Sequence, residues 1–161
     1  AFSLSREENA TEESMEELKD LLETAALAWG AELLFHGVDM KPGMPTLCAR
    51  KGSTLLLGLS GNPFSAAVAF ELLVPPLLTK LAGARPAPLP YREATAADPF
   101  PKPSPTRRFL RGRLQDGLVS IPQAQANGQL RSMVGCNCLI DLPAGSGPLS
   151  PGDRVRLIPI P

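Results

Sequence analysis

Residues 55–67 are the part of this sequence best suited to chemistry, and the chemistry is the binding of an anion. A run of leucines ends at Gly58, a turn follows at Gly61 and Asn62, and Pro63 stands where a helix would begin. Such a strand-to-helix turn points the helix dipole and unpaired backbone N–H groups beyond the strand end. Phosphate or another oxyanion suits that environment. Any strand-to-helix connection can share the pattern, so spacing alone leaves both interpretations open.

A second segment, residues 36–45, places a cation on a stiff loop just upstream. Pro42, Gly43 and Pro45 restrict the backbone beside Lys41. A lysine ammonium is a compact charge that suits phosphate or an oxyanion. The alternative is a solvated surface lysine, which is the default for any single lysine.

Hydrophobic spacing predicts the elements that position these two segments. A capping box at Ser14 and Glu17 starts a helix that ends at Gly30, and short strands are expected at residues 33–36, 46–50 and 54–59. A longer apolar helix is expected from Pro63 to about residue 81. Pro75 and Pro76 should kink or break this helix.

The second half of the chain has a different character. Residues 84–106 are rich in proline and alanine and are predicted to be an extended linker. Short strands with turn signals follow at residues 108–114, 118–121, 138–141 and 154–159, with a hairpin at Asp116 and Gly117. The predicted fold class is α/β plus all-β. Residues 1–83 would form a partial open α/β domain and residues 107–161 a small β-barrel domain.

Composition excludes several classes of protein. Sixteen basic and sixteen acidic residues balance, so no bulk attraction to nucleic acid or membrane is expected. No run reaches ~18 uninterrupted apolar residues, which argues against a transmembrane helix. The N-terminal residues lack the pattern of a signal peptide, which predicts a cytoplasmic protein. Three cysteines and one histidine favour reduced thiols over a disulfide framework or a zinc site.

Four segments together resemble the molybdopterin molybdenumtransferase family, the MoeA-type enzymes that include the E domain of gephyrin. Residues 41–45 match its KPGxP loop, and residues 58–66 match its GLPGNPxSA turn. Residues 108–114 resemble its FxRGxL strand, and residues 125–132 resemble its QGSxxLSS segment. The resemblance covers about residues 30–161, the C-terminal part of the family's α/β domain and its C-terminal β domain.

The resemblance implies a reaction at the end of molybdenum cofactor synthesis. Molybdenum from molybdate is inserted into adenylylated molybdopterin, AMP is released, and Mg²⁺ assists. Lys41 is the catalytic residue carried over. The substrate- or anion-binding residues carried over are Gly61, Asn62, Pro63, Ser65, Arg111 and Asn127. No metal ligand can be matched. A homodimer and an upstream molybdopterin adenylyltransferase are the implied partners.

The chain also departs from the family pattern. Ser60 replaces the first proline of the turn, Asn127 replaces a common serine, and Gly37 stands where some members have a lysine. Residues 1–14 show neither the TGGxS loop nor the acidic residues that precede this region in the family. We therefore expect the C-terminal portion of an enzyme.

Two alternatives remain open. The first is a non-catalytic module of the same family that serves dimerisation or scaffolding. The second is a small nucleic-acid-binding β domain, suggested by the basic cluster Arg107, Arg108, Arg111 and Arg113. Nucleic-acid surfaces usually add exposed aromatic residues and a basic total charge, and Phe109 is the one aromatic residue nearby. The second alternative is therefore the weaker one.

Overall fold

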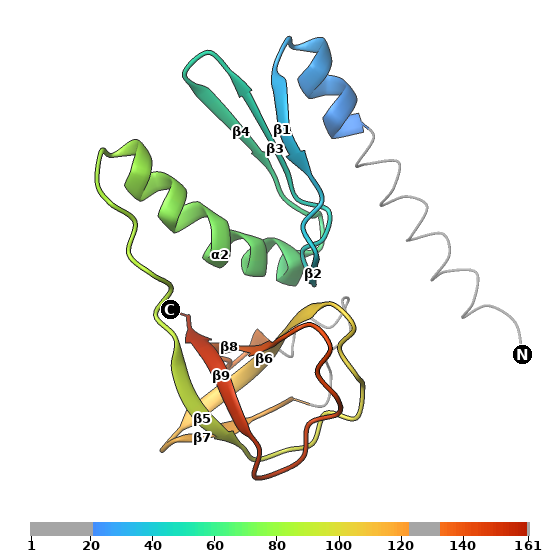
Figure 1. Cartoon of the computed structure of the whole chain (residues 1–161), viewed down its shortest axis with the longest axis vertical. Helices are drawn as coiled ribbons and strands as arrows, with labels where there is room; N and C mark the ends of the chain where they lie inside the picture. Colours follow the sequence, from blue (N-terminus) through green and yellow to red (C-terminus); the bar gives the residue numbers. More distant parts are fainter. Residues whose placement is uncertain (1–20, 123–132, 161) are drawn as a thin grey trace, which may run out of the picture. The chain divides into compact units, whose positions relative to one another are not determined.

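The structure, a computed structural model, describes residues 21–122 and 133–160, which fall into two compact units (Figure 1). The first unit takes in the described residues up to Val38 together with Pro45–Gly61. The second takes in Asp39–Met44 and the described residues from Asn62 onward. The loop that carries Lys41 therefore belongs to the second unit, although the residues on both sides of it belong to the first.

A helical segment and a short sheet make up the first unit. Residues 21–28 are helical, and Gly30 follows with a left-handed φ of 82°. The N–H groups of Gly30 and Ala31 donate to the carbonyls of Leu27 and Ala26 at 2.8 and 3.0 Å. This is the hydrogen-bond pattern of a Schellman motif, and it confirms Gly30 as the end of the helix.

The sheet of the first unit is antiparallel and has the order β1 (Glu32–His36), β3 (Leu47–Lys51), β4 (Thr54–Gly58). Its core is small, because alanines supply much of it. The buried members are Ala26, Ala31, Leu47 and Ala49, with Leu33 and Leu56 packed against them. All three strands begin and end within about a residue of the predicted limits.

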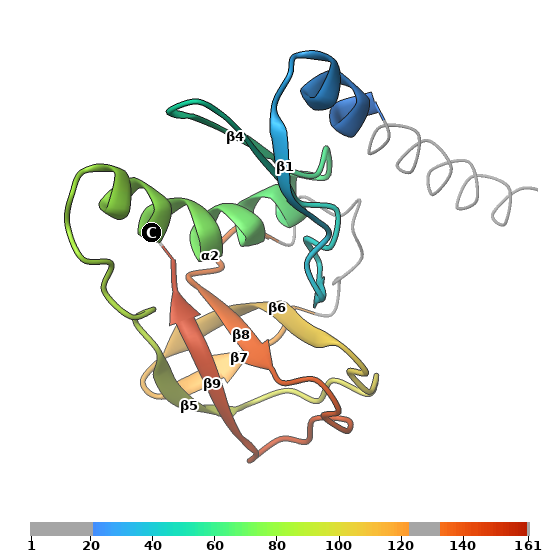
Figure 2. The same cartoon turned by 45° about the horizontal axis from the view of Figure 1, so that its top comes forward.

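The second unit contains a closed barrel of five strands. These are β5 (Arg92–Ala96), β6 (Arg107–Gln115), β7 (Leu118–Ser120), β8 (Cys138–Leu142) and β9 (Arg154–Pro159). Because β6 pairs with both β7 and β8, the order β6-β7-β5-β9-β8 closes on itself. Figure 2 shows β8 and β9 side by side in this barrel. A sixth strand, β2 (Met40–Lys41), adds to β6 in parallel.

Alternation along β6 separates an apolar interior from an outer face. Leu110 and Leu114 belong to the barrel core, which also contains Val119, Ile140 and Leu157. The odd-numbered residues of the strand face the other way, since successive side chains of a strand point to opposite sides. Arg107, Arg111 and Arg113 therefore share the outer face, as the sequence predicts.

Gly112 marks the tightest place in the barrel. A Cβ atom at this position would lie 2.8 Å from a methyl group of Val119 and 2.9 Å from the sulfur of Cys138. Both neighbours are fully buried and cannot move aside easily. β6 therefore needs a residue without a side chain at this point.

The helix α2 (Pro63–Leu81) also belongs to the second unit. It runs without a break through Pro75 and Pro76, so a break at these prolines is wrong, whereas a kink stays a prediction. Proline removes a backbone donor, and here the helix continues past the two missing donors. Phe64, Ser65, Val68 and Ala69 are its buried residues. By length and composition alone α2 could cross a membrane, a test that core helices of water-soluble domains also pass.

The barrel begins earlier than the sequence indicates. The sequence predicts a linker at residues 84–106, yet β5 lies within them and pairs with β7 and β9. Isolated bridges at Phe100 and Ser104 attach the rest of this stretch to the 143–149 region. The α/β plus all-β fold class is confirmed, with an open sheet and a small barrel. The predicted capping box at Ser14 lies outside the described residues.

Candidate anion site

Strand β2 fixes the Lys41 loop to the barrel. Met40 pairs with Arg107 and Lys41 with Arg108, so the loop starts from the edge of β6. Met40 is buried and anchors the loop, whereas Lys41 is exposed. The ammonium of Lys41 is therefore held on an anchored backbone and remains accessible to a ligand.

The loop then packs against the first turn of α2. Gly43 is buried with a left-handed φ of 105°, and a Cβ atom there would lie 2.6 Å from the Met40 methyl carbon. The same Cβ position is 3.6 Å from the carbonyl oxygen of Ser65. Glycine is thus required by the left-handed backbone conformation, and the Ser65 carbonyl lies at ordinary contact distance from it. The KPGxP loop and the start of α2 are neighbours within one unit.

Asn62 caps α2 and accepts the backbone N–H groups that the sequence analysis expects to be available to an anion. Its side-chain oxygen accepts the N–H groups of Phe64 and Ser65, each at 3.1 Å, and its carbonyl accepts that of Ala66 at 2.9 Å. Pro63 has no N–H group to offer. The first-turn donors are therefore satisfied within the chain, which corrects the expectation of unpaired N–H groups. What the helix start still supplies is the positive end of its dipole.

Arg111 reaches the same helix turn from the barrel. It is 1% exposed, and its guanidinium carbon lies 4.0 Å from the centroid of the Phe64 ring. Burial lowers the pKa of Arg111, and the nearby Cys136 thiol opposes this effect. Burial also raises the pKa of Cys136, partly offset by the arginine charge. A desolvated cation thus lies against the first turn of α2.

The remaining predicted site residues have other positions. Gly61 is exposed and ends the first unit, whereas Ser65 is buried. Asn127 lies outside the described residues. Sequence reasoning missed Phe64, which it treated as part of an apolar helix. Its position directly after Asn62 and Pro63 could have indicated that its side chain contacts the element packed against the helix start.

The described residues do not form a metal centre. No group of three or more His, Cys, Asp or Glu side chains within residues 21–122 and 133–160 is arranged to hold a metal ion. Mg²⁺ requires oxygen ligands in a near-octahedral arrangement, usually including carboxylates. The donors described here therefore do not fit the Mg²⁺ that the resemblance implies. Cys48, Cys136 and Cys138 are not joined in disulfides.

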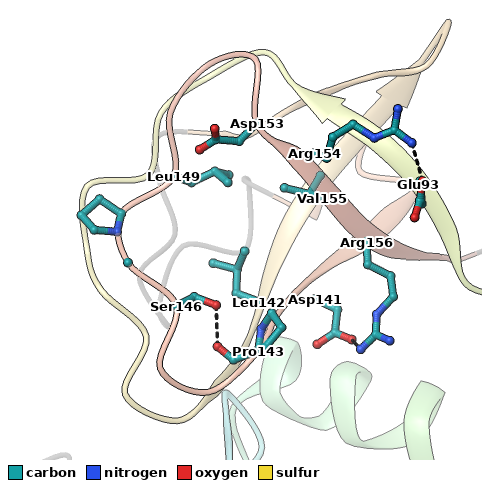
Figure 3. Close-up of a pocket in the computed structure, with 12 residues that line it drawn as sticks. Glu93, Asp141, Leu142, Pro143, Ser146, Leu149, Asp153, Arg154, Val155 and Arg156 are labelled. Carbon is teal, nitrogen blue, oxygen red and sulfur yellow. Dashed lines mark hydrogen bonds and ion pairs between the residues drawn. The ribbon is translucent and has the colours of Figure 1, made fainter.

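A separate open pocket of about 570 Å³ lies at one end of the barrel (Figure 3). It is lined by Glu93 from β5, by the end of β8 and the loop after it, and by the start of β9. Arg156 and Asp141 face each other on its rim. None of the predicted site residues that the structure describes lines this pocket, so it is distinct from the candidate anion site.

Comparison with known proteins is consistent with these motifs. Residues 93–160 match the family model described as "MoeA C-terminal region (domain IV)". Residues 11–80 match the one described as "Probable molybdopterin binding domain".

Two curated relatives are molybdopterin molybdenumtransferases. A molybdopterin molybdenumtransferase of Bacillus subtilis (strain 168) is 37% identical over 134 residues, covering 80% of this chain and 31% of that protein. One of Staphylococcus aureus (strain Mu50) is 33% identical over 132 residues, covering 80% and 32%. The chain therefore spans about a third of the length of these relatives.

Solved structures agree with the sequence matches. A molybdopterin biosynthesis moeA protein from Pyrococcus horikoshii OT3 is similar with a TM-score of 0.64 and 26% identity, over 79% of this chain and 32% of that one. A second structure of moeA protein from P. horikoshii gives a TM-score of 0.71 at 23% identity, over 90% and 41%. The second likeness supports the fold alone.

Proposed function

Because the chain belongs to the molybdopterin molybdenumtransferase family, whose C-terminal region it matches, we propose that it contributes to molybdenum insertion into adenylylated molybdopterin with release of AMP. Its homologues support a role in molybdenum cofactor biosynthesis. The particular reaction and the part that this chain plays in it are the proposal.

One observation supports the proposal above the others. The Lys41 loop, the start of α2 and Arg111 belong to one compact unit, and Gly43 and Phe64 provide the contacts that join them. The substrates carry anionic groups, namely the tetrahedral oxyanion molybdate and a pyrophosphate link. Fixed cations at such groups stabilise developing negative charge without reorganisation during the reaction. Lys41 would bind the oxyanion, while Asn62 and Pro63 keep the helix dipole directed at it.

The proposal extends to the setting of the reaction. A molybdopterin adenylyltransferase would supply the adenylylated substrate, and the chain would act in the cytoplasm as part of a homodimer. Mg²⁺ would be bound by residues outside the described part, because the described residues hold no suitable cluster.

Binding and turnover together test this function. We expect the chain to bind molybdate and AMP in isothermal titration calorimetry, yet to insert molybdenum poorly when adenylylated molybdopterin and magnesium are added. Binding follows from the cations described above, and poor turnover follows because residues 21–122 and 133–160 provide no carboxylate cluster for Mg²⁺. Absence of any anion binding would contradict the proposal, and full turnover would show that the carboxylates are dispensable.

A second candidate, a dimerisation or scaffolding module, is favoured by the exposed apolar side of α2. Phe70 is 46% exposed, Leu78 56% and Leu81 59%. Large apolar side chains exposed together often mark a protein interface. Sedimentation equilibrium distinguishes the two candidates when combined with the calorimetry, because a pure scaffold would dimerise without binding molybdate or AMP.

The nucleic-acid alternative loses support from the arginine geometry. Arg107 is hydrogen-bonded to Asp141, and Arg111 is buried. Two members of the basic cluster are therefore engaged within the protein.

A further inference from the structure

We propose that Arg108 is a second cation of the anion site and binds a tetrahedral oxyanion together with Lys41. The oxyanion is molybdate or the phosphate group of AMP, which share this chemistry. The inference rests on the proposed function, because it gives Lys41 a partner and names the group that the two side chains would hold.

Strand pairing places the two side chains next to each other. Lys41 of β2 is the direct partner of Arg108 of β6 in a parallel ladder. Paired residues of neighbouring strands present their side chains on the same face, and successive residues alternate between faces. Lys41 and Arg108 therefore share one face, whereas Met40 and Arg107 share the other. Because neighbouring strands lie about 4.8 Å apart, two long basic side chains in register can reach one oxyanion.

The guanidinium of Arg108 is partly buried and has a donor without an acceptor. Its carbon lies 5.3 Å from the centroid of the Phe100 ring, which is a buried member of the barrel core. Its Nε atom is buried and has no hydrogen-bond partner in the described part of the chain. Removing a guanidinium N–H from water without giving it an acceptor costs free energy. An oxyanion that accepts from Arg108 would offset this cost.

Carboxylates of the protein do not neutralise the two cations. Neither Lys41 nor Arg108 forms an ion pair among residues 21–122 and 133–160. Asp141, on the strand that pairs with β6, instead pairs with Arg107 and Arg156. Two like charges directly opposite each other in a sheet repel. An oxyanion with two negative charges removes this repulsion and supplies several acceptor oxygens at once.

A pair of ordinary solvated cations makes different predictions. In that case Arg108 should matter for anion affinity no more than Arg113, which is exposed and lies further along β6. If Arg108 only packs on Phe100, its replacement should lower the unfolding temperature and leave anion binding intact. Binding by the pair requires that the replacement of Arg108 weakens anion binding itself.

The test is the affinity of the full chain for molybdate, AMP and adenosine, measured by isothermal titration calorimetry at low ionic strength. We expect Arg108→Gln to weaken the binding of molybdate, AMP or both about ten- to hundredfold, as expected for a charge-assisted contact. Arg108→Lys keeps the charge but loses the planar donor fork, and should weaken binding about three- to tenfold. Arg113→Gln removes the same charge from the other face of β6 and should stay within about twofold of the parent chain. Adenosine has no oxyanion, so any binding of it should be the same in all four proteins.

Thermal unfolding provides a second measurement that a packing role would not change. Molybdate or inorganic phosphate should raise the unfolding temperature of the parent chain and of Arg113→Gln, because a ligand that binds only the folded state stabilises it. The rise should be lost or strongly reduced in Arg108→Gln. A lower unfolding temperature of Arg108→Gln with an undiminished rise would overturn the inference.

The outcomes separate this inference from the proposed function. If the parent chain binds neither molybdate nor AMP, the proposed function fails and the role of Arg108 fails with it. If the parent chain binds and Lys41→Ala weakens binding, but Arg108→Gln binds as well as Arg113→Gln, only the role of Arg108 is overturned. A loss confined to molybdate or to AMP supports the inference and identifies which oxyanion the two cations hold. Should Arg108→Gln fail to fold, Arg108→Lys decides the question by the same comparison.

Discussion

Two arrangements of arginine on the outer face of the barrel show how the partner of a charge decides its use. Arg107 and Arg156 share the buried carboxylate of Asp141, with hydrogen bonds of 2.7 to 2.9 Å. Arg111 instead lies against the Phe64 ring. The hydrogen bond to Asp141 raises the pKa of Arg107, whereas burial lowers that of Arg111.

The contrast separates a structural cluster from a candidate binding cation. Asp141 is 1% exposed and connects β8 to β6 and β9. The two arginines therefore pair with a buried carboxylate and stabilise the barrel. The Tyr91 hydroxyl and ring complete this cluster. The same residue type on one strand thus pairs with a buried carboxylate in one place and lies against the first turn of α2 in the other.

The largest expected effect is on the structural side of this comparison. Asp141→Ala should lower the free energy of unfolding by about 3–5 kcal/mol, because it leaves two arginines around an emptied, buried carboxylate site. Urea denaturation followed by circular dichroism measures the loss. Glu93→Ala removes the exposed Arg154–Glu93 ion pair and serves as the control, with an expected loss below about 1 kcal/mol. Equal losses in the two variants would mean that the Asp141 cluster is not structural.

The binding side of the comparison is tested through Lys41. Lys41→Ala should weaken molybdate or AMP binding roughly ten- to hundredfold, as expected for a charge-assisted contact, and leave the unfolding midpoint unchanged. Lys102→Ala, at an exposed position of the second unit, is the control. Lys51 is less suitable, because its ammonium donates to the Trp29 carbonyl and lies over the Trp29 ring. If the Lys41 and Lys102 substitutions change the affinity equally, Lys41 is an ordinary surface lysine and not a binding residue.

A substitution at Gly112 tests the packing of the barrel interior without removing an arginine. Gly112→Ala should cost about 1–3 kcal/mol of stability, since the added methyl group overlaps Val119 and Cys138. Thermal unfolding measures the change. Gly147→Ala adds a methyl group where no atom lies within 4 Å and should be close to neutral. An equally neutral Gly112→Ala would show that the barrel interior can relax around the new group.

The smallest expected effect is the pH dependence of the Asp141 cluster. Burial by itself would raise the pKa of the Asp141 carboxyl, but the hydrogen bonds and charges of Arg107 and Arg156 outweigh it and hold the pKa below its usual range. A carboxyl with a depressed folded-state pKa contributes stability above its unfolded pKa of about 3.9 and loses it as the pH falls through the folded value. The unfolding free energy of the parent chain should therefore fall more steeply below about pH 4 than that of Asp141→Ala. Parallel pH profiles of the two proteins would contradict this assignment.

Local patterns predicted most of the individual elements. The α2 limits, the hairpin at Asp116 and Gly117 and all the predicted strands that lie in the described residues follow from periodicity and turn residues. The same reasoning did not find β5 within the proline-rich stretch, because its five residues satisfy their backbone only by pairing with β7 and β9 far along the chain. It also did not find β2, which is two residues long and exists through its pairing with β6.

The candidate site likewise has features that local sequence patterns predict and features that depend on long-range contacts. By itself the sequence determined the identity of the motifs and their local geometry: a cation beside Pro42 and Gly43, an asparagine cap before Pro63, and an arginine on the outward side of β6. Only the tertiary structure decided that Asn62 satisfies the first-turn donors, that Gly43 packs against the start of α2, and that Phe64 meets Arg111. Periodicity and capping depend on residues a few positions apart, whereas the partner of a buried charge is set by strands and helices that the chain brings together over long separations.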